Sequence, residues 1–191
     1  MREPLPEDAP FDDDPRAAVE ALAAFQRAID ARNSGLMHEA VRELERSVQL
    51  GHRRAAAYLG RMLRDGQGVP ADPARAVHLL ERAAAQGDAV AAKEAARMLA
   101  VSAPRRAAAL ARRAVELDPD DSGAWLLLGE LLLHPDIKAY AEAEDAFLEA
   151  LGRAEAGMPA DPLRQGKALI EGNEGLARAR KAQGRRPHEP R

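Results

Sequence analysis

A repeat of 36 residues, from position 38 to position 74, is the feature that most constrains how this chain can fold. The segments HEAVRELERSVQLGHRRAAAYLGRML (38–63) and ARAVHLLERAAAQGDAVAAKEAARML (74–99) align without a gap. Matching positions are Ala40-Val41 with Ala76-Val77, Glu45-Arg46 with Glu81-Arg82, Gly51 with Gly87, and Met62-Leu63 with Met98-Leu99. A period of this length indicates supersecondary units that stack in a row, because a single unit cannot bury its own apolar face.

Each unit is predicted to contain two α-helices. Val77, Leu80 and Ala84 recur at helical spacing. Asp72 precedes a proline and can cap a helix start, while Gly87 stands where a left-handed helix end favours glycine. Aromatic residues make up only 3% of the chain, and alanine and leucine dominate its apolar part, which favours helices over strands. The expected helices are 16–32, 36–50, 53–64, 73–86, 88–100, 104–117, 122–133, 137–156 and 162–183.

Residues 55–92 resemble the sel-1-like repeat, a relative of the tetratricopeptide repeat. The residues that carry this resemblance are Leu59-Gly60, Gly66, Gly68-Val69, Asp72, Ala76, Ala83-Ala84 and Gly87. Residues 107–133 and 138–151 resemble a tetratricopeptide repeat at Trp125, Leu128, Gly129, Leu132, Ala143, Phe147 and Ala150. The resemblance implies an all-α fold, an α-solenoid of about four antiparallel helix pairs plus a C-terminal capping helix.

The glycine-containing stretch DGQGVPADP, residues 65–73, has two possible roles. A phosphate-binding loop would need a preceding strand and a Lys-Ser or Lys-Thr pair, and neither is present. The resemblance instead implies a linker between the two antiparallel helices of one unit, in which glycine permits positive φ.

Composition predicts three regions and a cytoplasmic, bacterial protein. Residues 1–15 are acidic and proline-rich and are expected to be disordered, 16–184 form the solenoid, and 185–191 form a basic tail. No secretory signal is recognised, and the longest apolar run is interrupted by Glu130. The formal charge of −3 is too small to predict a nucleic-acid or membrane partner. The bacterial origin rests on abundant alanine and on arginine in excess of lysine.

Two short motifs imitate functional sites. His134-Pro135-Asp136 matches the tripeptide of J-domain co-chaperones, but the helix before it lacks a basic face. Pro135 is expected to end that helix and Asp136 to cap the next one. Residues 118–123 imitate the start of a calcium loop, but the glutamate falls one place late, so a turn capped by Asp and Ser side chains is expected.

No catalytic centre, cofactor or metal site is predicted. Cysteine is absent, which excludes disulfides and thiolate chemistry. The five histidines show no i, i+4 pairing typical of a helical metal site, and no serine has a nucleophile-elbow context.

The leading hypothesis is a non-enzymatic scaffold that binds a partner protein or peptide on the concave face. In the family, the first helix of each unit lines that face, and the corresponding positions are Arg61, Arg64, Lys93, Arg97, Glu130 and His134. The four cations are expected to form a patch for an acidic peptide or carboxylate. One alternative is a dedicated chaperone or immunity-type partner of a secreted bacterial effector. Another is nucleic-acid association through the basic residues of 178–191. The partner and the oligomeric state stay open.

Overall fold

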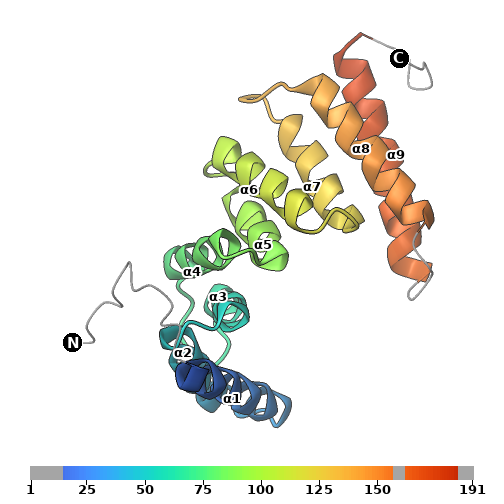
Figure 1. The fold of residues 1–191 in the computed structure, drawn as a ribbon. Coiled ribbons are helices and arrows are strands. Elements are labelled where there is room, and N and C mark those ends of the chain that lie inside the picture. Colours follow the sequence, from blue (N-terminus) through green and yellow to red (C-terminus); the bar gives the residue numbers. More distant parts are fainter. Residues whose placement is uncertain (1–14, 157–161, 185–191) are drawn as a thin grey trace. The chain divides into compact units, whose positions relative to one another are not determined.

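The computed structural model describes residues 15–156 and 162–184, and within them every regular element is a helix (Figure 1). The helices are α1 (Pro15–Asn33), α2 (Met37–Gln49), α3 (Arg53–Asp65), α4 (Pro73–Ala85), α5 (Ala89–Leu99), α6 (Pro104–Leu117), α7 (Ser122–Leu132), α8 (Tyr140–Ala156) and α9 (Pro162–Ala182). Extensive packing joins α1 to α2, α3 to α4, α5 to α6 and α7 to α8, and α9 packs on α8. The predicted helical-repeat fold, with four pairs and a final helix, is confirmed.

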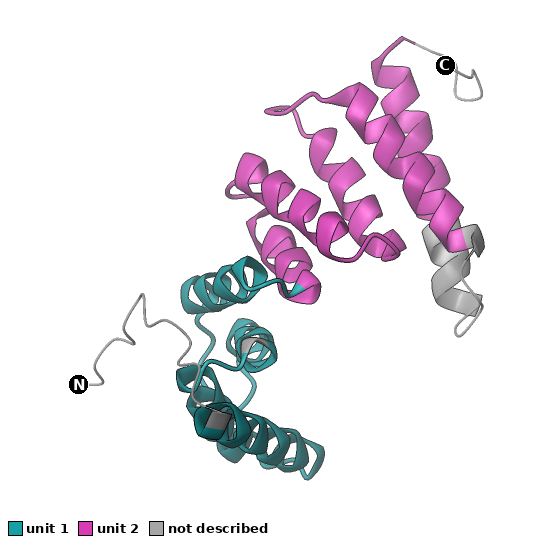
Figure 2. Ribbon diagram, in the orientation of Figure 1, with its two compact units in different colours: residues 1–88 teal, residues 89–191 magenta. Residues whose placement is uncertain are grey.

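The chain divides into two compact units, residues 1–88 and 89–191 (Figure 2). In unit 1 helices α1 to α4 each pack on the next helix along the chain, and the same holds for α5 to α9 in unit 2. The predicted single solenoid over 16–184 with separate terminal segments stays a prediction, because residues 1–14 and 185–191 lie outside the described residues.

Alanine lets the helices of a pair approach closely. Helices α5 and α6, which pack closely on each other, bury mostly alanines, and such small side chains allow two helix backbones to lie near each other. These alanines are Ala91, Ala92, Ala95 and Ala96 of α5 and Ala107, Ala108 and Ala111 of α6.

Both predicted ends of α4 are confirmed. The Asp72 carboxylate accepts a hydrogen bond from the backbone N–H of Arg75 at 2.9 Å, which satisfies one of the free donors of the first turn. Gly87 has φ +88°, and the N–H of Asp88 donates to the Ala83 carbonyl at 3.0 Å, as in a Schellman ending.

The glycine-containing stretch links α3 to α4, as predicted. Gly66 ends α3 with φ +67°, and Gly68 has φ +70°. A Cβ on Gly68 would lie 2.5 Å from the carbonyl carbon of Met37, at the start of α2. Only glycine fits there, so the stretch both reverses the chain and packs against the preceding pair.

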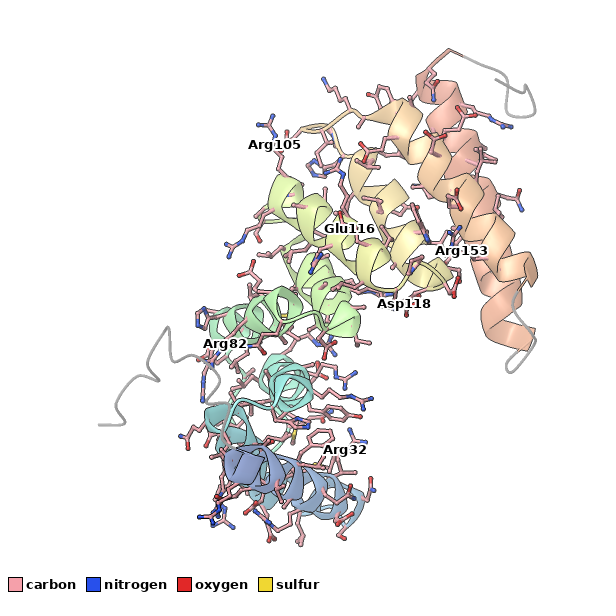
Figure 3. All side chains as sticks on the ribbon, in the orientation of Figure 1. Arg32, Arg82, Arg105, Glu116, Asp118 and Arg153 are labelled. Carbon is pink, nitrogen blue, oxygen red and sulfur yellow. The ribbon has the colours of Figure 1, made fainter. Side chains whose placement is uncertain are left out.

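The turn between α6 and α7 is held by side chains from both sides. The Asp121 carboxylate accepts from the backbone N–H of Gly123 at 2.9 Å, so the predicted Asp cap is confirmed. The indole N–H of Trp125 donates to the Pro119 carbonyl at 2.8 Å. Arg153 of α8 also donates to that carbonyl, and its guanidinium lies 4.9 Å from the centroid of the Trp125 ring (Figure 3).

The start of α8 differs from the expectation. It begins at Tyr140, three residues after the predicted position 137, so Asp136 is too far away to cap it and that prediction is wrong. The His134 carbonyl accepts from the N–H groups of Ile137 at 2.9 Å and Lys138 at 3.0 Å. Lys138 has φ +55°, a left-handed conformation that cannot continue into a helix, so the turn takes up the extra residues.

Candidate functional site

Described residues of unit 2 line a groove. It is open to solvent and has a volume of about 330 Å³. We call it the α5–α7–α9 groove. Its lining residues are Arg97 of α5, Gly123, Leu126, Leu127 and Glu130 of α7, and Glu171, Glu174 and Arg178 of α9.

The groove exposes apolar surface because of the composition of α7. Leu128, Leu131 and Leu132 lie on the buried face of this helix. Leu126 and Leu127 project from a different part of the helix surface and are only half-buried. An almost wholly apolar helix thus supplies both a core face and a patch available to a ligand.

Charged side chains surround these leucines. Arg178 donates to the Glu130 carboxylate through both terminal nitrogens, one of them at 3.0 Å, and so joins α9 to α7. Arg97 and Glu174 have no ion-pair partner among the described side chains. One positive and one negative charge are therefore available to a bound molecule.

Two of the predicted contact residues, Arg97 and Glu130, come together in this groove. Lys93 does not line it. Its ammonium pairs with Asp121, and the two side chains are 18% and 22% exposed. Because Asp121 also caps α7, Lys93 ties α5 to the start of α7 and its charge is largely compensated.

His134 lies in the turn after α7, because that helix ends at Leu132. It is not among the residues that line the groove. Its Nδ1 accepts a hydrogen bond from the N–H of Asp136 at 3.3 Å, and Arg105 donates to the Asp136 carbonyl at 3.2 Å (Figure 3). The His-Pro-Asp tripeptide is therefore part of a hydrogen-bonded turn between α7 and α8.

Sequence reasoning missed the contribution of α9, which it treated only as a cap. Glu171, Glu174 and Arg178 follow one another at i, i+3 and i+7, so they share one face of this helix. That spacing was visible in the sequence, but only the packing of α9 beside α7 gives it a meaning.

Unit 1 holds a cluster of rings and arginines on α1 and α3. The Arg61 guanidinium lies 4.5 Å from the centroid of the Tyr58 ring, and the Arg32 guanidinium lies 5.3 Å from it. Phe25 meets Tyr58 edge to face at 5.3 Å and stacks on His52 at 4.6 Å. Of these, only Arg61 was predicted to be a contact residue.

Arg64, the remaining predicted contact, binds its neighbour Asp65 through two hydrogen bonds of 2.7 and 3.0 Å. This bonding, together with the charges of Arg64 and Arg61, lowers the pKa of Asp65 below its ordinary value. The charge of Arg64 is thus partly neutralised within the protein.

The described part of the chain bears on metal binding, on membrane-spanning helices and on the basic end of the sequence. No group of three or more histidine and carboxylate side chains there is arranged to hold a metal ion. None of its helices is long and apolar enough to cross a membrane. The nucleic-acid hypothesis used the basic residues of 178–191. Two of them, Arg178 and Arg180, lie on α9 and pair with Glu130 and Glu144, respectively. Residues 185–191 lie outside the described residues.

Residues 53–88 match the Sel1 repeat family. These residues are similar to one Sel1 repeat. The match covers α3, the glycine linker and α4, which together form one helix pair of unit 1. The resemblance drawn from the sequence is confirmed. Sel1 repeats are commonly protein–protein interaction scaffolds and are typically non-catalytic.

Three solved structures have a similar fold. A Sel1 repeat protein from Oxalobacter formigenes is 20% identical, with a TM-score of 0.62 over 85% of this chain and 76% of that one. The protective antigen c5321 of uropathogenic Escherichia coli, which displays an SLR fold, is 15% identical, with a TM-score of 0.61 over 88% and 43%. The MamA protein is 15% identical, with a TM-score of 0.59 over 87% and 88%. At these identities the likeness concerns the fold alone.

This chain therefore spans less than half the length of the c5321 chain. Among curated protein sequences, no match to the present chain is found.

Proposed function

We propose that this Sel1 repeat protein is a non-enzymatic scaffold that binds a partner protein or peptide, with the α5–α7–α9 groove as the contact in unit 2. The observation that carries the proposal is the combination of half-buried leucines with uncompensated charges at Arg97 and Glu174. Leu126 and Leu127 supply apolar contact, and the two charges give orientation and selectivity.

The dimensions of the groove fit this kind of recognition. A volume of about 330 Å³ accommodates a few side chains of a partner but not a folded domain. In repeat proteins affinity accumulates from side chains on successive helices, and here three helices contribute. A segment with one apolar residue over Leu126 and Leu127, and with flanking charges toward Arg97 and Glu174, would contact both leucines and pair with both charges.

The test begins with affinity capture of the partner from the source organism, identified by mass spectrometry and then purified. Arg97→Glu is expected to weaken binding of that partner at least about tenfold by calorimetry, since about 1.4 kcal/mol corresponds to a factor of ten. The melting temperature is expected to stay unchanged, because Arg97 makes no ion pair among the described side chains.

Arg42→Glu is the matched control. Arg42 is an exposed arginine of α2, the second helix of its pair, and it also has no ion-pair partner among the described side chains. Its reversal is expected to leave partner affinity unchanged. If both reversals weaken partner binding equally, or if Arg97→Glu leaves it unchanged, the groove is not the binding site.

The identity of the captured partner also decides between the general scaffold and a dedicated chaperone or immunity-type role. Capture of a single secreted effector would favour the dedicated role. For nucleic-acid association, the pairing of Arg178 with Glu130 and Arg180 with Glu144 is unfavourable, because those arginines already have carboxylate partners.

A further inference from the structure

We propose that Arg32, Tyr58 and Arg61 of unit 1 form a site for an acidic peptide segment whose two carboxylate side chains contact the two guanidinium groups. This inference rests on the proposed scaffold function and names the chemistry of a contact outside the α5–α7–α9 groove.

The two arginines converge on one ring. Their guanidinium carbons lie 5.3 and 4.5 Å from the Tyr58 centroid, so they are at most about 10 Å apart. Tyr58 in turn contacts Phe25, which stacks on His52. Figure 3 labels Arg32 in this part of unit 1. Aromatic contacts from α1 and α3 therefore pre-order both cations before a ligand arrives, which lowers the entropy lost on binding.

Neither cation makes an ion pair or a hydrogen bond with a carboxylate among the described side chains, and the nearest charge effect is that of Arg61 on the pKa of Asp65, a carboxylate already bound to Arg64. Other arginines of α1 and α3 do form ion pairs: Arg27 pairs with Glu43 at 2.8 Å, and Arg64 pairs with Asp65 at 2.7 Å. A guanidinium that stacks on a ring by its face keeps N–H donors along its edge, and those donors fit a carboxylate in a bidentate manner. Arg32 and Arg61 can thus each donate to one carboxylate of a ligand while they stay against the Tyr58 ring.

The spacing favours a peptide over a nucleic acid. Side chains at i and i+2 of an extended peptide lie on the same side, about 7 Å apart, a separation that two such guanidiniums can span. A nucleic acid requires a longer series of cations along its phosphates to bind tightly. The expected recognition element is therefore two acidic residues separated by one residue.

The first experiment uses NMR on the full chain with an amidated, acetylated peptide of sequence Gly-Ala-Asp-Ala-Asp-Ala-Gly as the probe. Titration at low salt is expected to shift the side-chain Nε–Hε signals of Arg32 and Arg61 but not that of Arg42. The matched probe with asparagine in place of both aspartates is expected to bind at least about tenfold more weakly, because it removes the charge at constant shape.

The second experiment repeats the titration with variants. Arg32→Gln and Arg61→Gln are each expected to weaken the aspartate peptide about fivefold or more, and the double variant to reduce it to the level of the asparagine peptide. Arg42→Gln is expected to bind like the unmodified chain. Circular dichroism checks that each variant retains its helices.

Equal binding of the two peptides would overturn the site, and so would shifts that spare Arg32 and Arg61. A single-stranded oligonucleotide that displaces the peptide at equal charge concentration would overturn the choice of ligand. If the peptide fails to bind while the captured partner still depends on Arg97, this inference is lost and the scaffold function is kept.

Discussion

Two glycines make room for Phe147, a phenylalanine of α8 that is fully buried. A Cβ on Gly129 of α7 would lie 2.7 Å from a carbon of its ring, and a Cβ on Gly175 of α9 would lie 2.2 Å from one. The ring therefore occupies space that any other residue would need at both positions. Three helices of unit 2 meet at this one side chain.

Gly175→Ala is expected to lower the free energy of unfolding by about 1–3 kcal/mol, the usual cost of overpacking a core. Urea denaturation measures it. Gly152→Ala, on α8, is the control, because a Cβ there meets no atom within 4 Å. It is expected to raise stability by about 0.5–1 kcal/mol, since alanine favours a helix more than glycine does. Equal effects of the two changes would contradict this account of the ring.

The pair Arg112–Glu142 makes a small pH-dependent contribution to stability. Two hydrogen bonds of 2.7 and 2.9 Å from Arg112 lower the pKa of Glu142 below its ordinary value of 4.5. The stabilisation is therefore fully present above that value and is lost as the pH falls through the lower pKa of the folded protein. With the two side chains 41% and 45% exposed, it is expected to stay below about 1 kcal/mol.

An NMR titration of the Glu142 carboxyl carbon measures this pKa directly. Arg112→Gln is expected to raise it toward 4.5, because the variant removes both the charge and the guanidinium donors. An unchanged titration in the variant would mean that another group sets the pKa.

At the scale of elements, α9 is attached to α8 through a buried carboxylate. Glu144 of α8 is fully buried and accepts from Arg180 at 3.0 Å and from Gln183 at 3.1 Å. Gln183 also donates to the Tyr140 carbonyl at 3.1 Å. A charge in this position fixes how the final helix lies on its neighbour, because moving the helix would leave buried groups without partners.

Glu144→Ala is expected to cost about 3 kcal/mol, because it leaves the nearly buried Arg180 without this partner. Hydrogen exchange should accelerate first in α9. Glu149→Ala is the control on the same helix, since Glu149 is 51% exposed and its pair with Arg153 is worth at most about 0.5 kcal/mol. Comparable losses from both variants would show that burial of the pair is not what matters.

The elements themselves were largely predictable, because their signals are local. The Asp72 cap, the Gly87 ending and the 3.6-residue periodicity each act within a few residues, and they gave α4 within one residue of its observed end. The start of α8 was not predictable, because the left-handed Lys138 carries no glycine or asparagine signal. Hydrogen bonds across that turn override the helical pattern.

The candidate sites were predictable only where the repeat pattern reaches. Arg97 and Glu130 were named because the resemblance assigns contact positions to the first helix of each unit; both line the groove, and their contact with a partner stays a prediction. Arg32 and Arg178 were not named as contact positions, because they lie before residue 55 and after residue 151, outside the stretches in which the resemblance was found. Which helix faces pack together depends on contacts between different helices, and a local sequence pattern does not reveal these contacts.

At the scale of the whole molecule, each helix packs mainly on its neighbours along the chain, so a local defect should stay local. Gly129→Ala is expected to reduce hydrogen-exchange protection in the helices of unit 2 and to leave α1 and α2 of unit 1 nearly unchanged. Exchange measured by mass spectrometry resolves the two regions. A uniform loss of protection along the chain would instead indicate that both units open as a single cooperative body.

The sequence has a single tryptophan, Trp125, and its ring lies in the turn where Pro119 and Arg153 meet, on the same helix as Leu126 of the groove. Indole emission depends on the polarity and the charges around it. Binding of a partner in the proposed groove is therefore expected to change the intrinsic emission of the protein, so that occupancy could be followed in real time without attaching a dye to either molecule.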